Sequence, residues 1–249
     1  MQSSVDYGKA FTFPQEDPEW IKKVAIAGVV ALLTVVPLLQ IIPILLLWGY
    51  VLEITRRVIA GETPVLPEWT DFGGLLKKGL FSLVVGLVYA LPLILLLACL
   101  GLPYLGVAFA GGNEDMANTL ATIASVASFC FGCLAAIYAL VMAVVMPAAI
   151  GRLAATGEIA PALHFGEVFA LVRAKPGVYI IVALLAGLAI SVLSSVGSIA
   201  CGIGAAWGIA YGAIAGGHLY GQAYRVASAG SGAAPMAPSL QPLNLSAVQ

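Results

Sequence analysis

The sequence contains few charged residues. Asp, Glu, Lys and Arg make up 9% of its 249 residues, whereas about 25% is usual for a soluble domain. Histidine occurs only twice, so the chain cannot supply a His-Glu-x-x-His or histidine-rich metal site. No phosphate-binding glycine loop is present. The basic residues occur singly or in pairs, which argues against nucleic-acid binding. We therefore expect no catalytic residues, no cofactor and no metal.

Long apolar runs make up most of the sequence. Hydrophobic residues make up 61% of the chain, the mean hydropathy is +1.02, and several runs approach the roughly 20 residues that cross a bilayer. An integral membrane protein is therefore expected. The first run follows Gln15-Glu16-Asp17 and lacks a small-residue cleavage site, so we expect it to be retained as a helix and not removed as a signal peptide.

The four cysteines, at positions 99, 130, 133 and 201, lie within apolar runs. Cys130 and Cys133 have the spacing of a redox or metal pair. Thiols in apolar surroundings are poor nucleophiles and behave as small hydrophobic groups, so an inert role is favoured.

The number of spans depends on residues 24–52, which are almost wholly apolar and are interrupted by Pro37, Gln40 and Pro43. A single kinked helix would put Lys22 and Arg56 on opposite sides of the membrane, whereas a hairpin would put them on the same side. With the hairpin, all eleven Lys and Arg residues of a six-span arrangement fall on one face. The positive-inside rule therefore favours the hairpin, with both termini cytoplasmic and the chain in the cell (inner, cytoplasmic) membrane.

The predicted fold class is an all-α, polytopic membrane helix bundle of about six transmembrane helices, arranged as three hairpins joined by two cytoplasmic amphipathic helices. Residues 1–17 form a polar segment expected at the surface, 18–227 a single transmembrane domain, and 228–249 a disordered tail rich in Ser, Ala, Pro and Gly. The hairpins cover about residues 20–60, 79–156 and 176–227, and the interfacial helices about 68–78 and 164–175.

An internal repeat is also predicted. A shift of 96 residues aligns the two copies in pairs: Arg56 with Arg152, Gly61 with Gly157, and Asp71 with Glu167. Each copy consists of a helix end with arginine, a glycine stop, an amphipathic helix and a new span. Repeats in one orientation indicate an axis along the membrane normal. The alternative is that any such bundle repeats basic ends and glycines.

The two amphipathic segments supply most of the candidate site residues. Their apolar side chains recur at helical spacing, and such helices lie in the membrane interface, where basic residues attract anionic lipid headgroups. Plain anchoring is the favoured alternative, and an ion pair with the neighbouring arginines is the favoured explanation of the glutamate at position 53. The polar or headgroup-binding candidates are Glu53, Arg56, Arg57, Trp69, Asp71, Arg152 and Glu167.

His218 and Gln222 complete the candidate list. They lie one helical turn apart near the cytoplasmic end of the last apolar run, beside Tyr220 and Tyr224. Such a pair could line a water-filled vestibule or bind a headgroup. A hydrogen-bonded structural histidine is the favoured interpretation.

Small residues predict which helices pack closely, because lipid gives helices no hydrophobic reason to associate. The last apolar run has glycine at every fourth position: Gly204, Gly208, Gly212 and Gly216. The preceding run offers small residues at the same spacing: Ala183, Gly187, Ser191 and Ser195. We predict that these two faces form a tight hairpin. The alternative is that one glycine stripe forms a dimer contact.

The first amphipathic segment and its surroundings carry a specific set of motifs: Asp17-Pro18-x-Trp20, Gly49-Tyr50, Arg56-Arg57, Gly61-Glu62, and Leu66-Pro67-Glu68-Trp69-x-Asp71 followed by Gly79. In these residues the chain resembles an uncharacterised prokaryotic membrane family catalogued as domain of unknown function 4013. The likeness is strongest over about residues 13–100, and Thr70 and Phe72 depart from the pattern. The resemblance implies a multi-span prokaryotic membrane protein and implies no activity or site residues.

The sequence favours a non-enzymatic integral membrane protein that acts as a structural or partner-binding subunit. Its expected partners are membrane lipids with anionic headgroups and either another protein or a second copy, with no nucleic acid. The second hypothesis is a small permease or channel for an apolar or amphipathic solute, with Gln40, Tyr211, His218 and Gln222 in one cavity. The third is a lipid-acting membrane enzyme, which requires Asp71 or Glu167 to meet His218 or an arginine.

Overall fold

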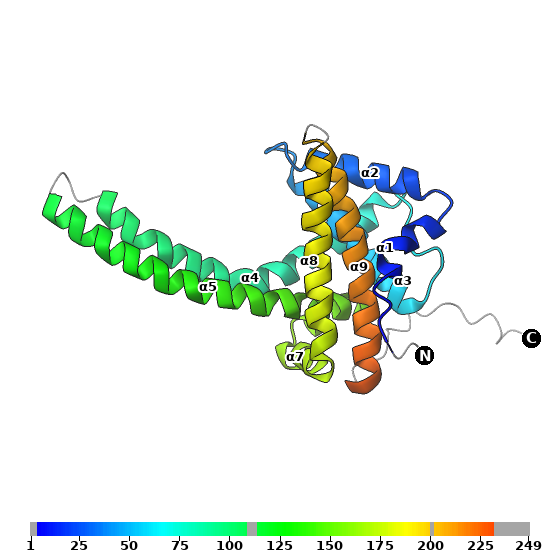
Figure 1. Ribbon diagram of the computed structural model, residues 1–249. Helices are drawn as coiled ribbons and strands as arrows, with labels where there is room; N and C mark the ends of the chain where they lie inside the picture. Colours follow the sequence, from blue (N-terminus) through cyan, green and yellow to red (C-terminus); the bar gives the residue numbers. More distant parts are fainter. Residues whose placement is uncertain (1–3, 109–113, 200–201, 232–249) are drawn as a thin grey trace, which may run out of the picture. The chain divides into compact units, whose positions relative to one another are not determined.

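The computed structural model describes residues 4–108, 114–199 and 202–231, and in these ranges every regular element is a helix (Figure 1). The N-terminal segment forms α1 (Lys9–Thr12) and the 3-10 helix η1 (Phe13–Glu16). The remaining helices are α2 (Trp20–Leu33), α3 (Ile41–Ala60), α4 (Phe72–Ala108), α5 (Glu114–Thr156), α6 (Ile159–Ala162), α7 (Phe165–Ala174), α8 (Pro176–Ser198) and α9 (Gly204–Ser231). The all-helical fold class is confirmed.

Three helices are long and apolar enough to cross a membrane: Phe72–Cys99 within α4, α5, and α8. Large apolar side chains project from them into open space, and on α5 Phe129 is 75% exposed and Leu140 is 71% exposed. An extended apolar surface of this kind marks a membrane or protein contact. These three helices are therefore compatible with membrane insertion.

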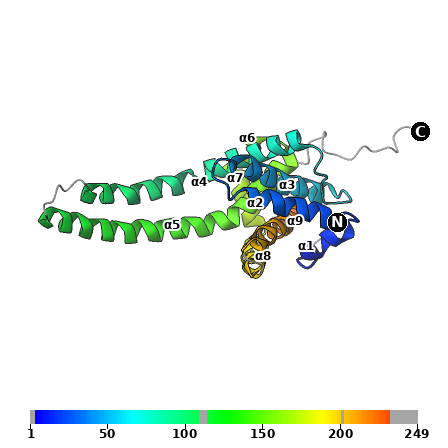
Figure 2. The ribbon, with the colours of Figure 1, turned by 90° about the horizontal axis from the view of Figure 1, so that it is seen from above.

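The chain forms two compact units, residues 1–85 with 144–249 (unit 1) and residues 86–143 (unit 2). In unit 2, α4 and α5 run side by side (Figures 1 and 2). The Tyr138 hydroxyl donates a hydrogen bond to the Tyr89 carbonyl oxygen at 2.5 Å. Cys130 and Cys133 are free thiols on the exposed surface of this unit.

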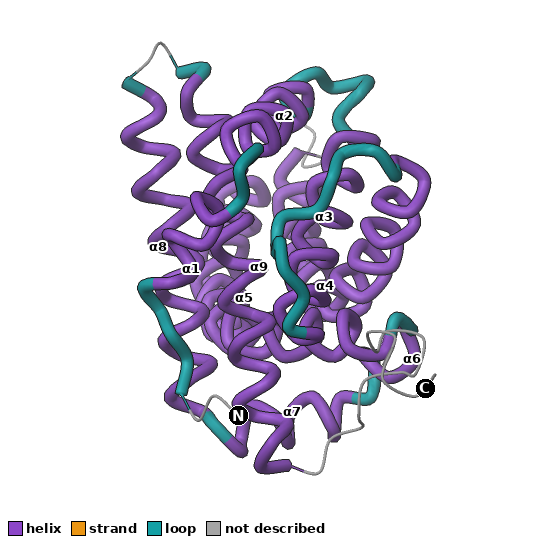
Figure 3. The backbone as a smooth tube through the Cα atoms, turned by 90° about the vertical axis from the view of Figure 1, so that its right-hand side faces the viewer, coloured by secondary structure: helices purple, strands orange, loops and turns teal. Residues whose placement is uncertain are grey.

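The central helix of unit 1 is α9, which packs against α2, α3, α7 and α8 (Figure 3). From Gly212 to Ala227 most of its positions are buried. A Cβ atom on Gly217 would lie 2.9 Å from the Val51 carbonyl oxygen of α3. A helix that is covered around its circumference needs such small residues wherever a neighbouring backbone approaches closely.

The predicted glycine face of α9 lies against α8. A Cβ atom on Gly208 would overlap the Leu193 carbonyl oxygen, and one on Gly212 would lie 2.7 Å from the Cα of Ile190. Gly204 contacts α8 through its carbonyl oxygen, which lies directly against Gly197.

The predicted face of α8 is wrong at Gly187 and Ser191. Gly187 has open space where a Cβ atom would be placed, and Ser191 is exposed. The small residues of α8 that are buried are Ala186 and Ala189. Because α8 is rich in small residues, spacing alone describes several stripes and cannot select the one in contact.

The apolar run at residues 24–52 does not form one continuous helix. α2 ends at Leu33, hydrogen-bonded turns cover residues 34–40, and α3 begins at Ile41. Pro43 is accommodated because it lies in the first turn of α3, where its missing N–H has no helical partner to lose. Residues 24–52 therefore form two helices joined by turns.

The first amphipathic segment differs from the prediction. No separate helix covers residues 68–78, because residues 61–71 form a loop and α4 runs from Phe72 into the apolar stretch without a break. The Asp71 carboxylate accepts the Gly74 N–H at 2.9 Å and so caps the start of α4. In the second segment α7 forms over Phe165–Ala174, and Pro176 begins α8 as a new helix.

Both ends of the described chain also differ from the prediction. The N-terminal segment is not a surface segment throughout, because Phe13 is 2% exposed and Asp17 is 4% exposed. α9 continues to Ser231, past the expected boundary at residue 227, and the remainder of the expected tail lies outside the described residues. Phe13 is covered because it stacks on His218, at 4.3 Å between ring centroids.

Candidate functional site

The candidate site lies where α3 and α4 cross in unit 1. A Cβ atom on Gly49 would overlap the Leu75 carbonyl oxygen of α4, and one on Gly79 would overlap the Leu45 carbonyl oxygen of α3. Only glycine permits two backbones to approach so closely. The crossing brings the basic second turn of α4 to the polar end of α3.

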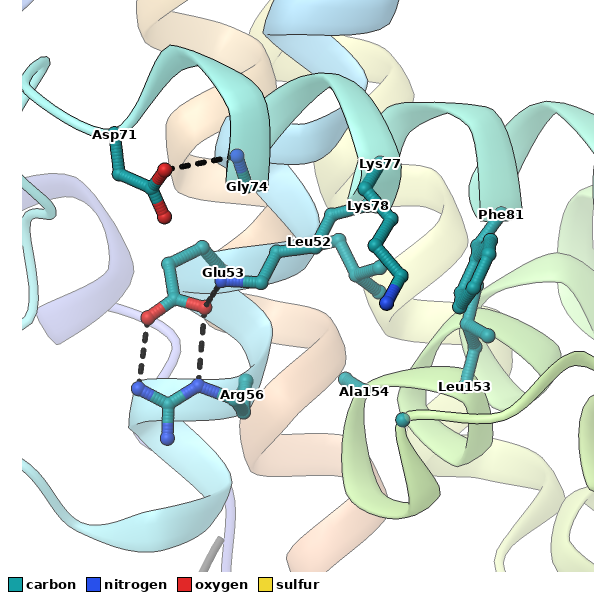
Figure 4. Close-up of a pocket in the computed structure, with 11 residues that line it drawn as sticks. Leu52, Glu53, Arg56, Asp71, Gly74, Lys77, Lys78, Phe81, Leu153 and Ala154 are labelled. Atoms are coloured by element: carbon teal, nitrogen blue, oxygen red, sulfur yellow. Dashed lines mark hydrogen bonds and ion pairs between the residues drawn. The ribbon is translucent and has the colours of Figure 1, made fainter. Parts of the chain in front are cut away.

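Glu53 is the centre of an ion-pair network at this crossing (Figure 4). Its side chain is 7% exposed. Arg56 donates from Nε at 3.0 Å and from Nη2 at 2.7 Å, and Lys78 donates from Nζ at 2.7 Å. Arg57 Nε adds a fourth hydrogen bond at 3.1 Å. The network joins α3 to α4, as well as two neighbouring turns of α3.

The surroundings of Glu53 keep its carboxyl group ionised. Glu53 is the first residue after the apolar run, and its burial tends to raise the pKa of its carboxyl group. Hydrogen bonds and charges from Arg56 and Lys78 more than offset the burial and hold this pKa at about 2. A group that is ionised throughout the physiological range does not exchange protons there, so Glu53 serves as an ion-pair centre.

The two arginines also fasten the loop that follows α3. Arg56 donates to both carboxylate oxygens of Glu62, at 2.7 and 2.8 Å. Arg57 donates to the carbonyl oxygens of Pro64 and Leu66, each at 3.2 Å. The bidentate Arg56–Glu62 pair fixes the position of the loop more firmly than a single hydrogen bond would.

Trp69 lies in the core of unit 1 and not on a lipid-facing surface. It is 7% exposed, and its ring stacks on Tyr50 with 4.3 Å between centroids. Its Nε1 donates to the carbonyl oxygen of Lys23 at 3.0 Å. The sequence placed Trp69 in an interfacial helix at about residues 68–78, but the helix begins only at Phe72, so helical spacing does not apply to Trp69.

One buried charge cluster was missed by the sequence analysis. The side chain of Lys23, which is 3% exposed, pairs with Asp17 at 2.7 Å and with Glu68 at 2.5 Å. The available signal was the pair of similar motifs around Trp20 and Trp69, which by themselves do not indicate that the two segments are in contact. The cluster ties the start of α2 to the loop before α4.

The second amphipathic segment holds its own ion pair. Arg152, whose side chain is 5% exposed, pairs with Glu167 and donates from Nε to the Pro161 carbonyl oxygen at 2.8 Å. His164 Nδ1 lies 3.7 Å from the Glu167 carboxylate. Glu167 and an arginine therefore meet, as the lipid-enzyme hypothesis requires, whereas Asp71 serves as a helix cap.

His218 and Gln222 fasten the N-terminal segment to α9. Gln222 Nε2 lies 2.8 Å from His218 Nδ1. The Gln222 side chain accepts the Asp6 N–H at 2.7 Å and donates to the Asp6 carbonyl oxygen at 2.9 Å. Tyr211 makes a similar contact, because its hydroxyl donates to the Phe11 carbonyl oxygen at 2.6 Å. Gln40, exposed in the turn after α2, takes no part in these described contacts.

A cavity of about 290 Å³ opens beside Glu53. One wall is polar and carries Arg56, Asp71 and Lys77 (Figure 4). The other is apolar, with Phe81 of α4 and the end of α5 at Leu153. The cavity is therefore amphipathic, and it lies where α4 enters its apolar stretch.

Comparison with known proteins gives a family and no named relative. A family model described as "Protein of unknown function (DUF4013)" matches residues 30–203, which is more than half of the chain. Neither the curated proteins nor the solved structures include a significant match. The matched range contains the ion-pair networks of Glu53 and Arg152 but not His218 or Gln222.

Proposed function

The chain belongs to the family described as "Protein of unknown function (DUF4013)", and from this premise we propose that it is a non-enzymatic integral membrane protein acting as a structural or partner-binding subunit. One observation carries the proposal: the polar candidates hold the chain's own elements together. Glu53 is hydrogen-bonded to three cationic side chains. Arg152 pairs with Glu167 and donates to a backbone carbonyl oxygen, and Gln222 donates to the N-terminal segment. Polar groups that are paired within the chain in this way stabilise its fold.

We further propose the six-span arrangement with both termini cytoplasmic. Contacts between helix ends support it. Lys23 at the start of α2 pairs with Glu68, just before α4. Arg225 of α9 donates to the Val58 carbonyl oxygen near the end of α3, at 3.3 Å. The cavity beside Glu53 is lined by the end of α3, the start of α4 and the end of α5. Basic ends that meet in this way are consistent with one shared cytoplasmic face.

Two matching helix ends support the proposed duplication. α3 and α5 each stop at a glycine with φ of +71°, Gly61 and Gly157 respectively, and only glycine adopts this conformation without strain. The copies differ in their ion pairs. Arg56 pairs within its own helix and loop, whereas Arg152 reaches Glu167 in α7.

A second candidate function, action on a lipid, has one observation in its favour. His164 lies beside Glu167, which in turn pairs with Arg152, and a histidine next to a carboxylate is a common general-base arrangement. The His164 and Glu167 side chains are 62% and 55% exposed, so water screens their interaction. We therefore rank this function second.

Native mass spectrometry of the full chain, purified in mild detergent, tests the proposed function. A stoichiometric protein partner is the expected result, and a chain that travels alone or only with lipid would overturn the subunit role. Membrane insertion is tested separately by extraction of membranes at alkaline pH, where an integral protein stays with the lipid. Reporter domains fused near residue 112 and at the C-terminus should report opposite sides of the membrane, and reporters on the same side would refute the proposed topology.

A further inference from the structure

We propose that the amphipathic cavity beside Glu53 binds the phosphate of an anionic phospholipid headgroup, with Lys77 as the residue that contacts it. The inference rests on the membrane insertion proposed above. It goes beyond that proposal because it assigns a ligand class and a contacting residue to one cavity.

The charges around the cavity leave one cation without a partner. The negative groups of the cluster are Glu53, Glu62 and Asp71, and the positive groups are Arg56, Arg57, Lys77 and Lys78. Both arginines and Lys78 pair with Glu53, and the arginines also contact Glu62. Within the described residues, Lys77 has no carboxylate partner. The cluster therefore has a net charge of +1. The Glu53 and Glu62 carboxylates are engaged by Arg56, Arg57 and Lys78, and the Asp71 carboxylate accepts the Gly74 N–H, so among the described residues Lys77 is the cation left for an external anion.

The Lys77 ammonium group is held where a ligand can reach it. Its Nζ lies 5.7 Å from the centre of the Phe81 ring. Lys77 and Phe81 both line the cavity (Figure 4). A cation over an aromatic ring is weakly attracted to it, but the ring accepts no full hydrogen bond. Lys77 is exposed, so its three donors are open to solvent and to an external acceptor. A phosphate oxygen supplies both the negative charge and the acceptor.

The shape of the cavity favours a lipid over a free phosphate. Leu52, Leu153 and Ala154 form an apolar part of the lining, and their side chains offer no hydrogen bonds to a small hydrated anion. A volume of about 290 Å³ is at the lower end for small-molecule sites, which suits a phosphate with its glycerol rather than a whole lipid. The acyl chains would then extend along the apolar part of α4.

The position along α4 agrees with this ligand. Lys77 lies two residues before Gly79, where the charged first turns give way to the apolar stretch. In an inserted helix this boundary is at the depth of the lipid headgroups, where basic residues gain most from an anionic leaflet.

Native mass spectrometry of the full chain, supplied with phosphatidylglycerol, phosphatidylcholine or inorganic phosphate, tests the site. The variants are Lys77→Gln, Lys77→Arg and the matched control Lys175→Gln. Lys175 is exposed and directly precedes the apolar helix α8, so its substitution makes the same charge change at another membrane entry without a role in the cavity.

The wild-type chain should retain phosphatidylglycerol in preference to phosphatidylcholine. Lys77→Gln should lower that retention about tenfold, or about 1.4 kcal/mol, as expected for one charged hydrogen bond. Lys77→Arg and Lys175→Gln should retain the lipid.

Four results would overturn the site. If Lys77→Gln and Lys175→Gln lowered phosphatidylglycerol retention equally, the effect would come from general surface charge and not from the cavity. Undiminished retention by Lys77→Gln would remove the contacting residue. Displacement of the lipid by inorganic phosphate would identify a soluble anion as the ligand. If the chain resists alkaline extraction but shows no preference for phosphatidylglycerol, only the lipid site is refuted. If the chain is extracted at alkaline pH, the proposed membrane insertion itself is refuted.

Discussion

Replacing Glu53 with glutamine would test whether the ion-pair network holds α3 against α4. The substitution keeps the size of the side chain and removes its charge. Arg57 and Lys78 would then face a neutral amide with one acceptor oxygen instead of a carboxylate that accepts four hydrogen bonds. We expect a clear loss of stability, with little change in fold.

The size of the loss follows from burial and from the remaining partners. Breaking a buried ion pair by removing one member costs about 3–5 kcal/mol. In the variant, water solvates Lys78, which is 36% exposed, and Arg56 keeps its ion pair with Glu62. Both effects reduce the loss of stability. We expect a net loss of about 2–4 kcal/mol. The pKa of Glu53 gives the same order, because its fall from 4.5 to about 2 corresponds to roughly 3 kcal/mol.

Thermal unfolding in detergent, followed by tryptophan fluorescence at one scan rate, measures the effect. A loss of this size should lower the unfolding midpoint by roughly 5–15 °C for a chain of this length. Glu114→Gln is the matched control, because Glu114 is an exposed glutamate in the first turn of α5. A midpoint for Glu53→Gln no lower than that of Glu114→Gln would refute the reasoning.

Other contacts give predictions of the same kind. The part of the stability that Glu53 contributes should be constant from neutral pH to about pH 5 and should fall below about pH 4.5, because the depressed pKa keeps folded Glu53 ionised while the unfolded group takes up a proton. The difference between acid titrations of the wild type and of Glu53→Gln isolates this contribution. Gly212→Leu should lower the unfolding midpoint, since its Cβ would lie 2.7 Å from the Ile190 Cα, whereas Gly187→Leu meets open space and should not. Equal midpoints would contradict the α8–α9 packing. Gln222→Leu should speed tryptic cleavage after Lys9 severalfold, because the N-terminal segment loses two hydrogen bonds. Gln40→Leu should leave that cleavage unchanged, as mass spectrometry of limited digests can show.

The local part of the candidate site could be predicted from the sequence. Glu53, Arg56 and Arg57 lie within one helical turn of each other, so helical geometry alone brings them together. Lys78 could not be identified as a partner, because it reaches Glu53 only through the close crossing at Gly49 and Gly79. That crossing depends on how two helices rotate and slide against each other, which no periodicity within one helix encodes.

The sequence by itself determined the helical class, the apolar stretches and the family. These follow from local hydropathy and motif spacing, because a backbone in lipid must satisfy its hydrogen bonds within each helix. The tertiary structure alone decided that Trp69 is buried against Tyr50, that Lys23 meets Glu68, and that α8 presents Ala186 instead of Gly187 to α9. Each of these contacts joins residues of different elements, and several faces of a helix rich in small or apolar residues satisfy the same pattern. Only the packing of the whole of unit 1 selects one of them.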